Sequence, residues 1–151
     1  MIDEGKVTLD VAPLTVWEFV LDVDQFAACM PGVEDLVMVD EHTFDGTMKA
    51  RVGPISGEFG FRARIMESDP PTELKAHVEG TDSLTKSTMT ADITMTLAAL
   101  EADRTELAYR AVVEVQGRLA IIGDMVLRAT GAQVIAEFFK RLRERVEGAT
   151  V

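Results

Sequence analysis

The sequence predicts an α+β fold in which a strongly curved antiparallel sheet wraps around a long C-terminal helix. Between residues 43 and 115, apolar and polar residues alternate in runs separated by turn sequences, which is typical of two-faced strands in a meander. From Leu119 to Val146, apolar residues recur at helical spacing instead. A chain of 151 residues has the size of one ordinary domain, so we expect a single domain over residues 1–151.

The first third of the chain is expected to contain one strand followed by two short helices. Apolar and polar residues alternate over 6–11, which predicts a half-buried strand. A helix should begin at Pro13, because proline lacks only a donor that is unpaired in a first helical turn anyway. Residues 22–29 should form a second helix, which ends before Pro31 because proline disfavours helical backbone at the preceding residue.

Six further strands are expected after these helices, which makes a sheet of seven, and then the long helix. The second strand is expected at 34–39, and the last helix from Ala120 to Glu147 against the concave face of the sheet. The residues expected on the inner face of the five later strands are Phe44, Met48, Ala50 and Val52, then Ile55, Phe59, Phe61, Ala63 and Ile65, then Leu74, Ala76 and Val78, then Met89, Ala91, Ile93, Met95 and Leu97, and finally Leu107, Tyr109, Ala111, Val113 and Val115.

Composition excludes several classes of function. The formal net charge is −11, whereas phosphate binding requires a basic surface, so we expect no nucleic-acid partner. Cys29 is the only cysteine, which excludes an internal disulfide and indicates a reducing compartment. No apolar stretch is long enough to cross a membrane or to serve as a signal core. We therefore expect a cytoplasmic protein, and transient peripheral contact with the inner face of the membrane stays open.

Four short stretches, in this order along the chain, resemble one known family. They are Val16-Trp17, Cys29-Met30-Pro31-Gly32-Val33, Val52-Gly53-Pro54-Ile55, and Gly117-Arg118-Leu119-Ala120 with Gly123 and the later Phe138-Phe139. Together with the order of elements they are similar to the CoxG family of carbon monoxide dehydrogenase subunits, within the START-like, or SRPBCC, superfamily. The resemblance covers the whole chain and implies the helix-grip (START/Bet v 1-like) fold.

The resemblance also implies a function. Relatives of this kind serve molybdenum hydroxylases of the carbon monoxide dehydrogenase type, and the implied ligand is a lipid-like molecule, with a quinone or another isoprenoid the leading candidate. No covalent cofactor is implied. The superfamily also contains lipid carriers and aromatic polyketide cyclases, so the fold alone does not decide function. A small cyclase-like or hydrolase-like enzyme, and a protein-interaction subunit with a filled core, remain the alternatives.

Candidate catalytic residues are few. Nucleophilic catalysis needs a serine or cysteine beside a base, but His42 falls in a turn and His77 on the outward face of a strand. No acidic residue falls on the inner face of the five later strands, so paired carboxylates are missing as well. Cys29 has no partner in the sequence that would activate it, and we expect it to be buried and inert. We therefore expect no catalytic residue and no metal site.

An apolar, methionine-rich inner face makes a ligand pocket between the sheet and the last helix the leading expectation. Tyr109 is the one polar aromatic residue on the late strands, and its hydroxyl should meet backbone, water or a ligand carbonyl. The first half of the last helix should line the pocket, whereas Phe138, Phe139 and Leu142 should be solid core. The expected ligand-binding residues are Met30, Pro31, Phe44, Met48, Phe59, Phe61, Met89, Ile93, Tyr109, Ile122, Met125, Val126 and Ala129.

Overall fold

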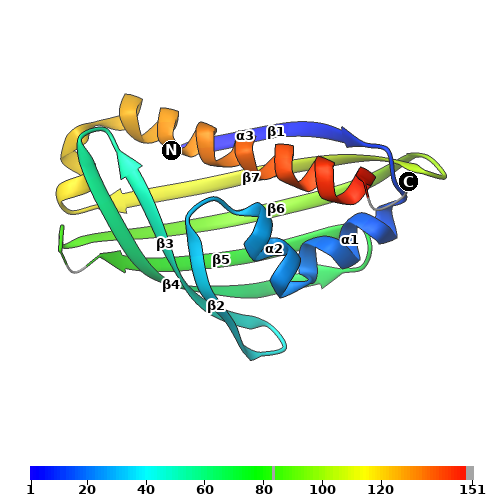
Figure 1. Cartoon of the computed structure of the whole chain (residues 1–151), viewed down its shortest axis with the longest axis horizontal. Helices are drawn as coiled ribbons and strands as arrows, with labels where there is room; N and C mark the ends of the chain where they lie inside the picture. The colour runs from blue at the N-terminus through cyan, green and yellow to red at the C-terminus, as the bar shows by residue number, and fades with distance from the viewer. Residues whose placement is uncertain (83, 149–151) are drawn as a thin grey trace.

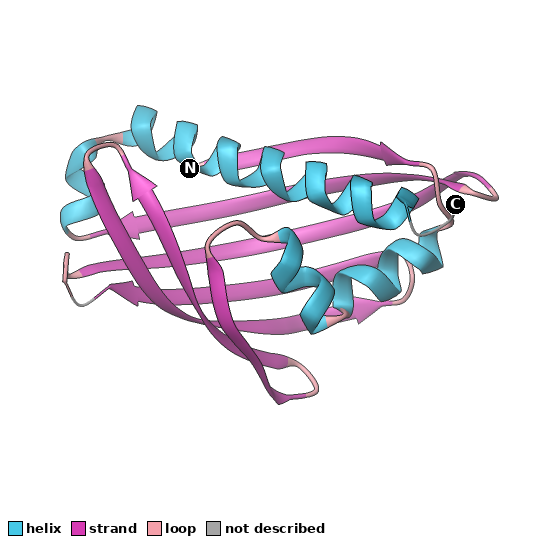
Figure 2. Cartoon of the chain, viewed as in Figure 1, coloured by secondary structure: helices cyan, strands magenta, loops and turns pink. Residues whose placement is uncertain are grey.

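A seven-stranded antiparallel sheet curves around one long helix (Figures 1 and 2), as the sequence predicts. The computed structural model describes residues 1–82 and 84–148. The strand order is β1-β7-β6-β5-β4-β3-β2, so the two short helices carry the chain from one edge of the sheet to the other. The elements are β1 (Ile2–Leu9), α1 (Pro13–Leu21), α2 (Val23–Cys29), β2 (Val33–Asp40), β3 (Thr43–Val52), β4 (Ile55–Asp69), β5 (Glu73–Asp82), β6 (Ser87–Glu101), β7 (Arg104–Gln116), the 3-10 turn η1 (Arg118–Ile122) and α3 (Asp124–Gly148).

The inner face of the central strands follows the predicted alternation. Ala76 of β5 pairs with Ile65 of β4 and with Ile93 of β6, so three predicted inward residues lie side by side across the sheet. Phe59 on β4 and Leu107 on β7 are buried on the same face. A slip of one residue would turn these side chains toward solvent, and for this reason the hydrophobic pattern specifies the register.

The first strand begins earlier than expected. Alternation alone suggested a start near residue 6, but β1 starts at Ile2 because its backbone pairs with β7 along its whole length. Asp3 and Gly5 consequently lie on the same face of β1 as Leu9, which is the inner face. Asp and Gly are poor strand formers, so local propensity misses this extension, and the ladder with β7 supplies the hydrogen bonds instead.

The last helix is interrupted where the sequence predicted a continuous one. Residues 118–122 form the 3-10 turn η1, and α3 begins only at Asp124. Between them Gly123 adopts φ of 101°, a conformation that glycine reaches without a steric penalty and that an α-helix does not contain. The expectation of one helix from Ala120 is therefore wrong at its start, and η1 changes the direction from which α3 crosses the sheet.

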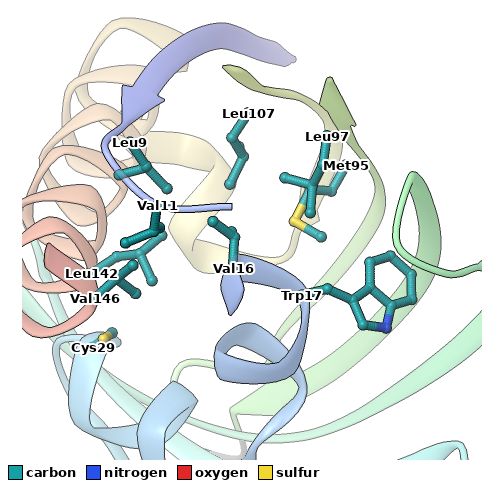
Figure 3. Close-up of a cluster of buried hydrophobic side chains, with 10 residues drawn as sticks. All are labelled: Leu9, Val11, Val16, Trp17, Cys29, Met95, Leu97, Leu107, Leu142 and Val146. Atoms are coloured by element: carbon teal, nitrogen blue, oxygen red, sulfur yellow. The ribbon is translucent and has the colours of Figure 1, made fainter. Parts of the chain in front are cut away.

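Two apolar clusters hold α3 against the sheet at its two ends. The first contains the two short helices, the C-terminal half of α3 and the strand ends beside them (Figure 3): Leu9, Val11, Val16, Trp17, Cys29, Met95, Leu97, Leu107, Leu142 and Val146. The second joins η1 and the start of α3 to β3 and β4 through Val52, Phe59, Leu119 and Leu127. Full burial of one such leucine contributes about 1.5–3 kcal/mol, so both ends of the helix are firmly placed.

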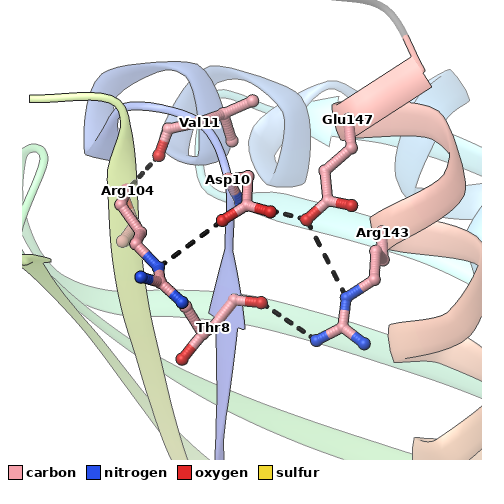
Figure 4. A network of polar contacts seen from close by, with 7 residues as sticks. Thr8, Asp10, Val11, Arg104, Arg143 and Glu147 are labelled. Atoms are coloured by element: carbon pink, nitrogen blue, oxygen red, sulfur yellow. Dashed lines mark hydrogen bonds and ion pairs between the residues drawn. The ribbon is translucent and has the colours of Figure 1, made fainter. Parts of the chain in front are cut away.

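A polar network also fixes the C-terminal end of α3 to the end of β1 (Figure 4). Arg143 donates a 2.9 Å hydrogen bond to the backbone oxygen of Thr8, and a carboxylate oxygen of Glu147 accepts one of 3.0 Å from the backbone N–H of Asp10. Arg104 of β7 approaches the carboxylate of Asp10 at 3.5 Å. These contacts close the gap between the edge strand and the helix at this end of the molecule.

Candidate functional site

A cavity of about 270 Å³ lies between the concave face of the sheet and the helices. Its floor is the inner face of β4 to β7, and its walls include the end of α1, the side of α2 and one side of α3. Val134, Ile135, Phe138 and Phe139 are the α3 residues that line it, at the i, i+1, i+4, i+5 spacing of one helix face. The cavity shares Met95 and Leu107 with the first apolar cluster, and none of the four core residues of the second cluster lines it.

The structure brings part of the predicted ligand-binding set together at this cavity. Met30, Phe44, Phe61, Ile93 and Tyr109 all line it, although they come from five different parts of the chain. What these residues share is the inward face of a strand or, for Met30, the turn after α2. Strand periodicity is sufficient to find residues of this kind, because it reports which face each side chain occupies.

The remaining members of the set lie elsewhere. Phe59 belongs to the second cluster, and Met89, Ile122 and Val126 pack against it. Met125 is 85% exposed, Ala129 is exposed as well, and the half-buried Pro31 and Met48 do not line the cavity. The first half of α3 therefore closes one end of the fold, because the break at Gly123 leads the chain into the second cluster.

The C-terminal half of α3 differs from the expectation in the opposite sense. Phe138 and Phe139 were expected to be solid core, and this is wrong, because both line the cavity. Leu142, one turn further, is 0% exposed and does belong to the core. Helical periodicity placed these side chains on the correct face of the helix but carried no information on where along the helix the space lies.

Several lining residues were missed at the sequence level. Leu21 from α1, Phe26 from α2 and Leu36 from β2 all border the cavity. Phe26 also contacts Phe138 with a ring-centroid distance of 5.6 Å, so the second short helix closes the cavity against α3. Their apolar character was visible in the sequence, but the packing of the short helices over the middle of the sheet was not.

Tyr109 supplies the one uncharged polar side chain among the lining residues. Its ring lies 5.1 Å from that of Phe139, and its hydroxyl lies so close to Gly5 that a Cβ there would stand 2.9 Å from the hydroxyl oxygen. Burial, and secondarily the charge of Asp3, raises the pKa of the Tyr109 phenol above its ordinary value. The hydroxyl therefore stays protonated at neutral pH, and within the described ranges it makes no hydrogen bond.

The site is thus an apolar cavity with one phenol, inside a sheet that grips a helix. The family model of the carbon monoxide dehydrogenase subunit CoxG matches residues 5–147, nearly the whole chain. The chain belongs to the CoxG family. Membership links the protein to carbon monoxide dehydrogenase as an accessory subunit, and the START-like fold indicates that it binds a hydrophobic ligand.

Solved structures agree with the helix-grip fold of this CoxG protein. A conserved protein from Geobacillus kaustophilus superposes with a TM-score of 0.91 at 21% identity, covering 99% of this chain and 97% of that one. A START superfamily protein from Mycobacterium smegmatis gives 0.75 at 14%, covering 98% of each chain. The Zhui aromatase/cyclase from a Streptomyces species gives 0.73 at 16%, covering 100% and 96%. At these identities the likeness shows the fold alone, and no curated protein sequence matches the chain.

The reactive side chains of the CoxG protein lie away from the cavity. His77 contacts Asp92 at 2.6 Å and Glu79 at 3.1 Å on the outer face of the sheet, and these hydrogen bonds, led by that of Asp92, raise its pKa. His42 is exposed in the turn between β2 and β3. Cys29 is fully buried in the first cluster, and its burial raises the pKa of the thiol, so the reactive thiolate is disfavoured.

Neither a metal cluster nor a membrane-spanning helix occurs in the described ranges, 1–82 and 84–148. Within these ranges no group of three or more His, Cys, Asp or Glu side chains is placed to hold a metal ion. No helix in the same ranges is long and apolar enough to cross a membrane. The chemistry offered by the described cavity is apolar contact and one phenolic hydrogen bond.

Proposed function

We propose that the protein binds a neutral lipid-like molecule, with a quinone or similar isoprenoid as the leading candidate, on behalf of a carbon monoxide dehydrogenase-type molybdenum hydroxylase. The observation that carries the proposal is the cavity itself, which is lined by apolar side chains except for Tyr109 and the exposed Arg64. A cytoplasmic location with peripheral contact at the inner face of the membrane belongs to the same proposal, since such ligands reside in membranes.

The size of the cavity limits how such a ligand would be held. Water occupies about 30 Å³ per molecule in the liquid, so 270 Å³ corresponds to about nine waters, the scale of a small ring system. A long tail would have to extend from the cavity along the apolar edges. Each buried methylene gains about 0.8 kcal/mol, and micromolar affinity corresponds to about 8 kcal/mol, so ring and proximal tail together reach a useful affinity without a charged anchor.

The alternatives are less well supported. A filled-core interaction subunit is disfavoured by the cavity. An enzyme like the aromatase/cyclase that shares the fold would need acid, base or nucleophile at the ligand, and no His, Cys, Asp or Glu is among the residues lining this cavity. Binding without chemistry is the function that these side chains favour.

The test is titration of the purified protein with short-tailed ubiquinone and menaquinone analogues and with a fatty acid, followed by quenching of Trp17 fluorescence or by calorimetry. We expect saturable binding of at least one quinone. Ile93→Arg puts a charge into the cavity and should weaken binding at least tenfold, because an unpaired charge is strongly disfavoured in an apolar space. Met125→Arg is the matched control, since Met125 is exposed, and binding should stay within twofold.

Circular dichroism and a thermal melt establish that both variants fold. Saturable binding of the fatty acid with none of the quinones would refute the quinone assignment and leave the carrier function standing. Equal loss in Ile93→Arg and Met125→Arg would show that the ligand does not occupy this cavity. The partner is tested separately, by whether the protein purified from its own host brings a molybdenum hydroxylase with it.

A further inference from the structure

The Tyr109 hydroxyl occupies a place that the sequence makes for it on the facing edge strand. Gly5 of β1 is the cross-strand partner of Tyr109, and a Cβ at Gly5 would stand 2.9 Å from the hydroxyl oxygen and 3.2 Å from two ring carbons. Phe139 of α3 packs on the ring from the other side. Because glycine removes the side chain that would push the ring away, the hydroxyl is held at the β1 border of the cavity.

A carboxylate lies beside this hydroxyl. Asp3 is two residues from Gly5, so it faces the same way on β1, and its cross-strand partner is Ala111, which lines the cavity and is 8% exposed. Asp3 is itself partly buried, and among the described residues it forms no ion pair. Its negative charge is thus uncompensated at this end of the cavity, and it is one of the causes that raise the pKa of Tyr109.

The only cation bordering the cavity within the described chain does not offset that charge. Arg64 lies on β4, and β7 and β4 are separated by β6 and β5, which is about 14 Å at the usual strand spacing. Arg64 is exposed and alternates with the inward Ala63 and Ile65, so its side chain belongs to the outer face. A ligand head group at Tyr109 therefore meets a hydrogen-bond donor and a negative charge but no positive one.

We propose that Tyr109 and Asp3 form a polar end of the cavity that accepts a neutral carbonyl oxygen and excludes an anionic head group. This inference rests on the proposed function and deepens it by naming the residues that select the ligand. Tyr109 donates its hydroxyl proton to the carbonyl, which a ketone or quinone offers. Asp3 repels a carboxylate at the same place, so a fatty acid of equal length loses affinity relative to the ketone.

The test compares a long-chain methyl ketone with the fatty acid of the same chain length at pH 8, where the acid is ionised. The wild-type protein should bind the ketone at least tenfold more tightly. Asp3→Asn should strengthen binding of the acid at least fivefold and leave the ketone within twofold, whereas Tyr109→Phe should weaken the ketone about fivefold and leave the acid unchanged. Glu4→Gln is the matched control, because Glu4 is the neighbouring carboxylate on the outer face of β1, where it approaches Arg110 at 3.5 Å.

A second measurement needs no ligand. Tyr109 is the only tyrosine in the chain, so absorbance near 295 nm (the phenolate band) titrates this hydroxyl alone. Asp3→Asn should lower the phenolic pKa relative to wild type, and Glu4→Gln should leave it where it is. An unchanged phenolic titration in Asp3→Asn, or equal changes for ketone and acid, would overturn the polar end. Failure of wild-type protein to bind either probe would overturn the proposed function, while the titration would still decide the placement of Asp3.

Discussion

An empty apolar cavity carries a large free-energy cost, and partly filling it should stabilise the protein. Destabilisation by cavities grows by about 24 cal/mol per Å³, so a dry cavity of 270 Å³ corresponds to about 6 kcal/mol. That is comparable to the whole free energy of unfolding of many domains. A larger apolar side chain directed into this space should therefore raise stability in the absence of ligand, in contrast to the usual effect of a large residue in a packed core.

Ala76→Leu is the substitution that tests this. Ala76 sits on the central strand β5 between Ile65 and Ile93, and all three line the cavity. Leucine adds three carbon atoms, worth about 2.4 kcal/mol at 0.8 kcal/mol each, and loses about 0.5–1 kcal/mol of rotamer entropy. The expected net stabilisation is about 1.5 kcal/mol, which for a domain of this size raises Tm by about 3–6 °C.

The assay is thermal and urea unfolding of the ligand-free protein, together with the quinone titration. Ala76→Leu should raise Tm and weaken ligand binding, so the two readouts move in opposite directions. Ala98→Leu is the control, because Ala98 is an exposed residue on the neighbouring strand β6, and it should change neither measurably. A lower Tm for Ala76→Leu would show that the site is already packed and would refute the cavity. Unchanged ligand affinity would show that the ligand binds elsewhere.

Three further predictions concern the frame that holds the cavity. Gly117→Ala should lower the free energy of unfolding by more than about 2 kcal/mol in urea titrations, because Gly117 has φ of 92° and a Cβ there would overlap the backbone oxygen of Lys86. Gly131→Ala, in the middle of α3 with open space around its Cβ, should instead stabilise by about 0.5–1 kcal/mol, and the same sign for both glycines would contradict this account. Asp82 is 3% exposed and accepts backbone hydrogen bonds from Glu58 and Leu84; burial raises its pKa, but the hydrogen bonds outweigh this and leave the pKa lowered. Its stabilising contribution is therefore present at neutral pH and lost as the pH falls through the lowered pKa, so Asp82→Asn should cost about 1–3 kcal/mol at pH 7 and progressively less in acid, and a difference that persists unchanged at pH 2 would refute the assignment.

Much of the fold could be predicted from the sequence because strand periodicity is a local property. Alternation in the central strands placed Phe61, Ile93 and Tyr109 on the inner face, and all three line the cavity. Pro13 begins α1 as expected. The inward pattern also lacks acids and bases on the central strands, and the prediction of a binding site without catalytic groups rests on that pattern.

The position of the cavity along α3 was decided only by the tertiary structure. The apolar stripe runs through Val126 and Phe138 with the same periodicity, so nothing local distinguishes the packed end of the helix from the end beside the cavity. The distance between helix and sheet depends on the curvature of the sheet and on the direction that Gly123 gives to the chain, and both are properties of the whole fold. Asp3 became an inward residue only through pairing of β1 with β7, because a ladder with a distant strand can extend a segment whose own residues do not favour it.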